Sequence, residues 1–316
     1  GQGLQVGVRR LLGVDGTRDL LGIGADGRHD LDADETIGRN ARLDRERNAP
    51  GEFRDRSFNG LDHIGCIAVL PELPVYGASD IKAADIPDLI REGNYQLQLA
   101  EGERLGICYP THGWQPPRIV REFIGKMTVV GKPEFCWALT TCGDNMGEAM
   151  TILNKDLEKK GLKAETCFSV IMPESYVCLP FMYTDPEEKE KRKIAQAKQQ
   201  LVHIIDIIKA CRKGVVELEK GATPRLYSYV IGSYFNKKMV TDHKFTVDAD
   251  VCIQCGKCVK LCPVDNIEGT PPVWLHNGKC TSCLACYHYC PVHAINFGKI
   301  TRKRDQYYFN RRADRK

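Results

Sequence analysis

Eight cysteines near the C-terminus have the type and spacing of metal-cluster ligands. They form two runs with the same pattern, C-x2-C-x2-C-x3-C-P, each closed by a proline. The three leading thiolates of a run fit three corners of an iron–sulfur cube, while the fourth cysteine turns away and binds the other cube. The spacing therefore predicts two [4Fe–4S] clusters, one held by Cys252, Cys255, Cys258 and Cys290 and the other by Cys280, Cys283, Cys286 and Cys262.

Zinc is the main alternative for clustered cysteines. Zinc modules usually supply two C-x2-4-C pairs rather than C-x2-C-x2-C triplets. A disulfide framework is typical of short secreted chains, whereas this chain has 15 cysteines in 316 residues. The cysteines outside the runs mostly lie in apolar stretches, as expected for buried thiols in a reducing compartment: Cys66, Cys108, Cys136, Cys142, Cys167, Cys178 and Cys211.

Composition limits the classes of function. A chain of 316 residues with 42% hydrophobic residues is expected to form about two domains. Its formal net charge of +4 is too small to indicate a nucleic-acid partner. No apolar run approaches the roughly 18–20 residues that span a bilayer. The Arg9-Arg10 pair is followed by charges where an export signal would be apolar. We therefore expect a cytoplasmic protein without a membrane span.

The first 60 residues differ in composition from the remainder. They contain no Tyr, Trp or Cys, no lysine precedes Lys82, and their leucines follow neither a helical nor a strand period. The segment Gly22–Gly27 matches G-x-G-x-x-G, but no β-branched strand precedes it, so it does not indicate a dinucleotide site. We expect residues 1–60 to be an atypical extension, either disordered or not native to the protein.

From about residue 61, short apolar runs alternate with helical patterns. Single helices between strands favour a parallel, doubly wound α/β sheet over residues 61–183. The expected strands are Ile64–Leu70, Leu105–Tyr109, Phe135–Thr140 and Cys167–Met172, and the expected helices include Ile119–Ile124 and Glu148–Lys160.

A long connecting helix is predicted over residues 184–222. Asp185 is placed to cap it, with Pro186 in the first position and Glu188 in the third. Apolar residues then recur at a 3-4 spacing as far as Leu218, and Gly221 is suited to end the helix. At 1.5 Å per residue this helix would be about 50 Å long.

Two loops are predicted to reach the ligand-binding edge of the sheet, beyond the carboxyl ends of its strands. One contains Thr111, His112, Gly113 and Trp114, and the other contains Thr141, Cys142, Gly143, Asp144 and Asn145. The indole of Trp114 could stack on a flat aromatic cofactor, and Gly143 would let the backbone approach it. The alternative is that Trp114 is a core aromatic residue and Gly143 only turns the chain.

A family resemblance favours the cofactor. The segments Tyr109–Ile124, Thr140–Gly147 and Phe168–Pro173, together with the cysteine runs Cys252–Pro263 and Cys280–Pro291, resemble the bacterial proteins that fuse a flavodoxin-like domain to a two-cluster ferredoxin. The resemblance covers roughly residues 80–310. It implies a flavodoxin-like domain over 61–183, a small α+β ferredoxin domain over 223–301 and a basic tail over 302–316. It also implies FMN, with Trp114 and Thr141–Asn145 at the ring.

The N-terminus departs from that family. A flavodoxin-like domain begins with a strand that leads into a T-G-N-[ST] loop, whose N–H groups bind the FMN phosphate. Neither Thr17 nor Thr36 is followed by Gly-Asn, and Asn59-Gly60 lacks the preceding strand. We therefore expect the normal first strand to be missing, with Ile64–Leu70 in its place, and the sequence shows no phosphate contacts for FMN.

The sequence as a whole predicts electron transfer through two [4Fe–4S] clusters, coupled to FMN where that site is intact. Redox proteins would serve as donor and acceptor. Two other functions stay open: a flavin-dependent enzyme that reduces a substrate near His112, Trp114 and Asp144, and an iron–sulfur sensor whose basic tail touches nucleic acid. Whether the chain is an enzyme or a carrier is not decided by these residues.

Overall fold

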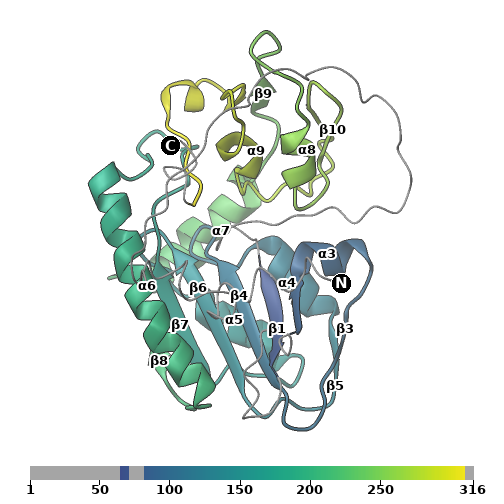
Figure 1. Ribbon diagram of the computed structural model, residues 1–316, viewed down its shortest axis with the longest axis vertical. Coiled ribbons are helices and arrows are strands. Elements are labelled where there is room, and N and C mark those ends of the chain that lie inside the picture. Colours follow the sequence, from purple (N-terminus) through teal and green to yellow (C-terminus); the bar gives the residue numbers. More distant parts are fainter. Residues whose placement is uncertain (1–64, 71–81, 310–316) are drawn as a thin grey trace, which may run out of the picture.

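The protein has two modules, a mixed six-stranded sheet with helices on both faces and a small cysteine-rich module above one edge of it (Figure 1). The computed structural model describes residues 65–70 and 82–309. The predicted extension over 1–60 and the last seven residues of the predicted tail lie outside this range. Among the described residues, no helix is both long enough and apolar enough to cross a bilayer.

The sheet is rich in parallel strands. Its order is β2-β1-β4-β6-β7-β8, and β4, β6, β7 and β8 run parallel to one another. The bounds are Lys82–Asp85 (β2), Cys66–Leu70 (β1), Arg104–Pro110 (β4), Cys136–Cys142 (β6), Thr166–Ile171 (β7) and Val216–Glu217 (β8). A separate parallel pair, Gln96–Gln98 (β3) and Thr128–Val130 (β5), lies beside it.

The prediction of an all-parallel sheet is wrong at one edge. Strand β1 is antiparallel to both β2 and β4, and its Cys66 is the register partner of Cys108. A parallel return within one sheet requires a crossover of about a dozen residues or more, usually with a helix. Only residues 71–81 join β1 to β2, so the antiparallel pairing is the one that this short connection favours.

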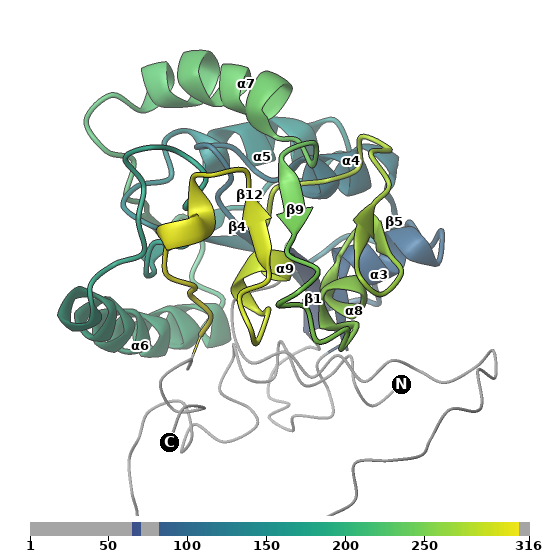
Figure 2. The ribbon, with the colours of Figure 1, turned by 90° about the horizontal axis from the view of Figure 1, so that it is seen from above.

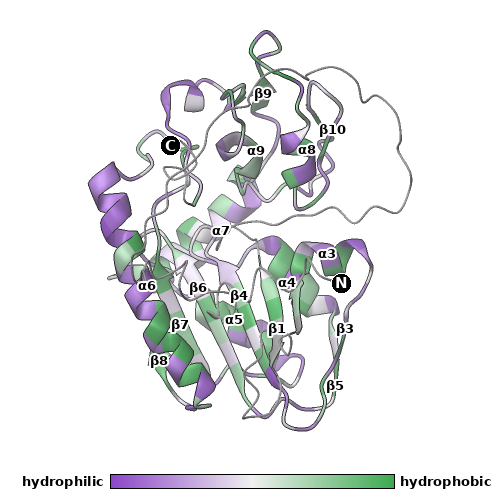
Figure 3. Cartoon of the chain, viewed as in Figure 1, coloured by the Kyte–Doolittle hydropathy of each residue, from purple (hydrophilic) through white to green (hydrophobic). Residues whose placement is uncertain are grey.

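Helices cover both faces of the sheet. Ile86–Arg91 (α3), Arg118–Lys126 (α4) and Ala149–Glu158 (α5) lie on one face, and Glu187–Lys209 (α6) lies on the other (Figure 2). Side chains of β6 alternate between them: Ala138 joins the core under α4 and α5, whereas Trp137 and Leu139 join the core under α6. The apolar residues accordingly concentrate in the strands, while the first turns of α6 are hydrophilic (Figure 3).

Helix α6 is shorter than predicted. It ends at Lys209, Cys211 and Gly214 follow with φ of 48° and 78°, and Val216–Glu217 pairs with β7 as a strand. The 3-4 spacing of apolar residues continues in the sequence beyond the end of the helix. Cys211 and Val215 pack against the same core as α6, but their backbone is not helical. Asp185 does not cap α6 as predicted, because Pro186 is the N-cap residue.

The cysteine-rich module is built from two small antiparallel strand pairs and two short helices. Its strands are Phe245–Val247 (β9), Ile267–Glu268 (β10), Val273–Trp274 (β11) and Ile295–Phe297 (β12), and its helices are Lys257–Leu261 (α8) and Ala285–His288 (α9). Strand β9 pairs with β12 and β10 with β11, so each half contributes to both pairs. Residues 226–239, here called the linker helix, connect this module to β8; they comprise Leu226–Ile231 (η2), Gly232–Tyr234 (α7) and Phe235–Met239 (η3).

Part of the predicted basic tail packs against the module. Gln306 donates a hydrogen bond to the Cys290 carbonyl of the module at 2.8 Å, while Arg304 donates to the Pro180 carbonyl, in the segment between β7 and α6, at 2.7 Å. Thr301–Lys303 (η4) precedes these contacts. The tail is thus bound to the module as far as Tyr307, whose N–H donates to His288 Nδ1 at 3.0 Å.

Candidate functional site

The two cysteine runs fold as near copies of each other. Equivalent positions 28 residues apart have left-handed backbones, a conformation that curls a loop so that its N–H groups turn inward. Non-glycine residues are held there only when the surrounding structure stabilises them. The pairs, with φ in degrees, are Gln254 (55) and Ser282 (52), Gly256 (67) and Leu284 (62), and Asp265 (47) and His293 (54).

Electrostatic interactions between the thiols cross from one run to the other. Burial, together with smaller contributions from the nearby thiols of Cys255 and Cys290, raises the pKa of Cys258 to about 11. Burial likewise raises the pKa of Cys283 to about 12, with contributions from Cys262 and Cys280. Each run therefore has the fourth cysteine of the other run as a neighbour. Coordination to iron would remove these protons, because only thiolates are ligands.

Backbone donors to sulfur also repeat. The N–H of Asn266 donates to Cys262 Sγ at 3.2 Å, and the N–H of Ala294 donates to Cys290 Sγ at 3.2 Å. Hydrogen bonds of this kind stabilise thiolate ligands and tune cluster potentials. Buried Leu284 and Ile295 provide an apolar surrounding, which also affects the potential.

This arrangement of repeated loops, converging thiols and N–H···S donors defines a [4Fe–4S]-binding module of the electron-transfer class. The family model described as "4Fe-4S binding domain" matches residues 245–268 and 273–296. The ferredoxin of Methanothermococcus thermolithotrophicus is 37% identical over 54 residues, which are 90% of that protein and 16% of this chain. Through its C-terminal module, the chain belongs to the ferredoxin family, and this module transfers electrons through [4Fe–4S] clusters.

Two further relatives match over the same part of the chain. The ferredoxin of Pyrobaculum islandicum is 34% identical over 58 residues, which are 51% of its length. The candidate electron transport protein YccM of Escherichia coli (strain K12) is 35% identical over 54 residues, and the chain spans 15% of it. Each match covers only 17% of this chain. No solved structure matches the chain.

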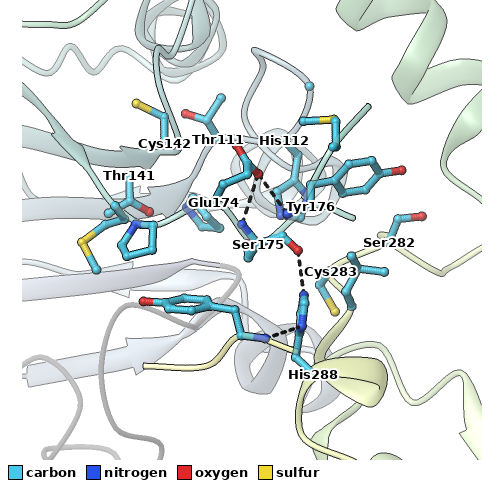
Figure 4. Close-up of a pocket in the computed structure, with 18 of the residues that line it drawn as sticks. Thr111, His112, Thr141, Cys142, Glu174, Ser175, Tyr176, Ser282, Cys283 and His288 are labelled. Carbon is cyan, nitrogen blue, oxygen red and sulfur yellow. Dashed lines mark hydrogen bonds between the residues drawn. The ribbon is translucent and has the colours of Figure 1, made fainter. Parts of the chain in front are cut away.

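A cavity of about 280 Å³ lies between the two modules (Figure 4). All nine residues predicted for the ring site line it: Thr111, His112, Gly113, Trp114, Thr141, Cys142, Gly143, Asp144 and Asn145. The loops after β4 and β6 therefore meet at the carboxyl edge, as predicted. From the other side, Thr281–Ala285 of the second cysteine run, including Cys283, line the same cavity.

The sequence prediction missed the loop after β7. Glu174, Ser175 and Tyr176 line the cavity and follow directly on the end of that strand. The rule that selected the loops after β4 and β6 would also have selected this one. His288 joins the modules here: Nε2 lies 2.7 Å from the Ser175 carbonyl, and Nδ1 accepts the Tyr307 N–H at 3.0 Å (Figure 4). Because Nδ1 is an acceptor, Nε2 carries the proton.

The linker helix fixes the loop after β4. Ser228 donates from Oγ to the Trp114 carbonyl at 2.8 Å, and Asn236 donates to the His112 carbonyl at 3.2 Å. The ring of Trp114 packs against Tyr227, with centroids 4.8 Å apart. One face of the indole is thus used for packing, which agrees in part with the alternative left open by the sequence.

The role expected for Gly143 needs correction. A side chain at this position would collide with the carboxylate of Glu174, and one at Gly113 would collide with Phe235. The space left by these two glycines is therefore occupied by the side chains of Glu174 and Phe235, whereas we expected it to let the backbone approach a cofactor. Burial, followed by the charge of Asp144, raises the pKa of Glu174, so the cavity contains a carboxyl that favours its neutral form.

Unsatisfied polar atoms indicate that the cavity suits a ligand with polar edges. Asn145 Oδ1, Thr281 Oγ1 and Ser282 Oγ are buried without a hydrogen-bond partner, and all three residues line the cavity. Such atoms are rare unless a ligand or water satisfies them. The volume lies just below the roughly 300–1,000 Å³ typical of small-molecule sites, which suits a flat ring system better than a whole nucleotide.

A phosphate cradle is not found in the part of the chain that the structure describes. Strand β2 leads directly into α3, whose N-cap is Asp85, a negative group where a phosphate would need donors. Strand β1 runs antiparallel, so its C-terminal end lies at the opposite edge from the cavity. Within residues 65–70 and 82–309, the cavity therefore has polar groups for the edge of a flat ligand but no cluster of donors for a phosphate.

The neutral state of His112 leads to a pH prediction. Burial lowers the pKa of His112 to about 4, from an unfolded value of about 6.5. The unfolded chain therefore binds a proton more readily between these values, and stability should fall as the pH is lowered from 6.5 toward 4. We expect the melting temperature of His112→Gln to fall less between pH 7.5 and 5 than that of the native protein. His203→Gln, at an exposed site, should behave as the native protein does, and an equal slope for all three would refute the assignment.

Proposed function

We propose that the chain is a two-module electron carrier in which electrons pass between a flavin ring in the cavity and the [4Fe–4S] clusters. The observation that carries this proposal is the shared cavity: Cys283 lines it together with Trp114 and Asn145. A cofactor bound there would be in contact with the loop that holds a cluster. Direct contact between redox centres favours rapid transfer without a docking step.

The cluster ligands belong to the same proposal. We assign Cys252, Cys255, Cys258 and Cys290 to one cluster and Cys280, Cys283, Cys286 and Cys262 to the other, with support from the crossed thiol interactions. The second cluster borders the cavity. The first lies toward solvent, because Cys255 is exposed and Ile253 beside it is 59% exposed. A redox partner protein would therefore exchange electrons at the first cluster.

The modules of this carrier are the sheet module over 61–183, the connecting segment 184–222 and the ferredoxin module over 223–301. The linker helix, at the start of the ferredoxin module, contacts the sheet module, since Ser228 and Asn236 hold the loop after β4. A cytoplasmic location is supported by the cysteines outside the runs, all of which are free thiols and all but Cys211 buried.

Each cavity residue has a definite part in this proposal. A bound flavin supplies the conversion between one- and two-electron steps. The free face of Trp114 covers the ring, and Asn145, Thr281 and Ser282 provide polar contacts at its edge. Neutral His112 keeps positive charge away from that edge, and the carboxyl of Glu174, whose pKa is raised mainly by burial, lies in the cavity where it can exchange a proton.

The first experiment is anaerobic purification with iron, sulfide and flavin quantified together. Two cubanes require about eight irons per chain. Because the described residues line a cavity for a ring but provide no phosphate cradle, riboflavin and FMN should bind with affinities within about threefold of each other. A preference for FMN above about a hundredfold would contradict the proposed mode of binding, since it would require several charge-assisted hydrogen bonds to the phosphate.

Trp114→Ala should weaken flavin binding about tenfold, because stacking on an aromatic side chain contributes roughly 0.5–1.5 kcal/mol beyond the area it buries. Quenching of flavin fluorescence measures the affinity. Tyr229→Ala is the matched control: it lies on the linker helix, 42% exposed, and is absent from the lining of the cavity. Equal affinity for both variants would exclude Trp114 from the ring site.

A substrate-reducing enzyme is the second candidate function. The observation in its favour is Glu174, a half-buried acid with a raised pKa at the place where a substrate over the ring would need a proton. Glu174→Gln keeps the shape and removes the acid. If the protein is this enzyme, the substitution should abolish turnover and leave photoreduction of the clusters unchanged. In a simple electron carrier there is no substrate turnover, and the substitution should leave photoreduction of the clusters unchanged.

A further inference from the structure

We propose that Asp242, His243 and His276 form a binding site for a divalent transition-metal ion of the zinc type, separate from the cysteine runs. Their donor atoms all lie within 4.8 Å of one another. One carboxylate and two imidazoles make up a ligand set that Zn²⁺ commonly uses, and three protein ligands leave a fourth position for water.

The fold brings these ligands together from two places in the chain. Asp242 and His243 precede β9, and His276 follows β11. Stacking of Phe245 on Trp274, with centroids 5.4 Å apart and planes within 7°, fixes the two segments against each other. Both histidines are exposed at the surface, so an ion can enter from solvent without opening the module.

The carboxylate is oriented before any ion binds. Asp242 is 3% exposed, and its Oδ2 accepts hydrogen bonds from Asn266 Nδ2 at 2.7 Å and from the His276 N–H at 3.1 Å. Neighbours that hold a ligand in this way are typical of metal sites. Its Oδ1 lies 3.1 Å from His276 Nδ1. Tetrahedral zinc with bonds of about 2.0–2.2 Å separates its ligands by about 3.3 Å, close to this spacing.

The backbone supports the same interpretation. His276 has a φ of 52°, a left-handed conformation that is unfavourable for a residue other than glycine and often marks a ligand-binding position. The alternative is an ordinary Asp–His pair with the two imidazoles stacked, 4.6 Å apart and 17° from parallel. That alternative predicts no affinity for zinc, so the two interpretations can be separated by experiment.

The full-length protein with its clusters reconstituted is titrated anaerobically with zinc chloride, and binding is followed by calorimetry. We expect one zinc per chain. Zinc X-ray absorption should show only nitrogen and oxygen neighbours at about 2.0–2.2 Å, without the sulfur shell at about 2.3 Å that binding to the cysteine runs would give. A sulfur shell would overturn the proposal.

Three alanine variants complete the test. His243→Ala and His276→Ala should each lower zinc affinity at least tenfold, and both remove exposed side chains, so the module should still fold. His203→Ala removes an exposed histidine that lies 3.0 Å from Glu217 and should leave zinc affinity unchanged. Native affinity in both His243→Ala and His276→Ala would reject the site.

The site has a consequence for the neighbouring cluster, and this part rests on the proposed ligand set. Asn266 contacts Asp242 through its side chain and Cys262 through its backbone N–H. A dication beside this cluster favours its more negative, reduced form, so zinc should raise its reduction potential in the native protein and not in His276→Ala. An unchanged potential with zinc bound would reject this tuning and leave the metal site standing.

Discussion

Replacing Cys286 with alanine is expected to reduce the iron content from about eight to about four per chain, with loss of the electron paramagnetic signal of one reduced cluster. Cys286 is 8% exposed and lies in the core of the module, near Cys283, Cys280 and Cys262. Because the side chain is buried, neither solvent nor a nearby residue readily replaces the missing thiolate.

Cys178→Ala is the matched control for this change. Cys178 is buried in the same core, burial raises its pKa to about 12, and the thiol of Cys280 contributes to that shift. It lies outside both runs, so its removal should leave the iron content unchanged. Equal loss of iron in the two variants would show only that a disturbed core releases clusters, and the ligand assignment would fail.

Double variants test whether the ligands cross between runs. If Cys258 and Cys290 bind the same cluster, Cys258→Ser/Cys290→Ser should retain about four irons. Cys258→Ser/Cys262→Ser removes a ligand from each cluster and should retain almost none. Ligation within each run predicts the opposite order, so iron analysis of these two proteins distinguishes the arrangements.

The sequence predicted the cysteine module well because its information is local. Four ligands within eleven residues, followed by proline, leave few possible backbones, and the repeat of Cys252–Cys262 at Cys280–Cys290 made the prediction stronger. The electron-transfer prediction is confirmed for this module. The sequence also indicated the loops after β4 and β6, because each follows an apolar strand pattern and ligands of such sheets bind beyond the carboxyl ends of the strands.

Other features depend on contacts that no local pattern contains. Glu174 approaches Gly143 so closely that a side chain there would collide with it, and this contact is between two separate loops. Ser282 reaches the cavity only because the two modules pack together. The end of α6 was missed because Cys211 and Val215 continue the apolar stripe and pack against the same core from the connection between α6 and β8. The direction of β1 was missed because strand patterns do not encode pairing.

Lys193→Met is expected to lower the free energy of unfolding by about 1.5–3 kcal/mol, because it removes a charge-assisted hydrogen bond to buried Asp185, which keeps Lys189 as its second cationic partner. Only 7% of the Lys193 side chain is exposed, and its ammonium lies 2.6 Å from Asp185 Oδ2. Although burial opposes ionisation of Asp185, hydrogen bonds from Lys189 and Lys193 lower its pKa overall. Urea denaturation of the full-length protein, followed by far-ultraviolet circular dichroism, gives the difference.

The control is Lys191→Met, which breaks an exposed pair with Glu187 at 2.9 Å and should change stability by less than about 1 kcal/mol. If both substitutions lower the free energy of unfolding equally, the Lys193–Asp185 pair contributes no more than a surface ion pair. The ammonium of Lys193 also donates to the Gly143 carbonyl at 2.8 Å, in the loop that forms the proposed ring edge. The buried charge of Lys193 both stabilises α6 against the sheet and holds the cavity loop in place. Lys193→Met should therefore weaken flavin binding as well as folding, whereas Lys191→Met should have little effect on either.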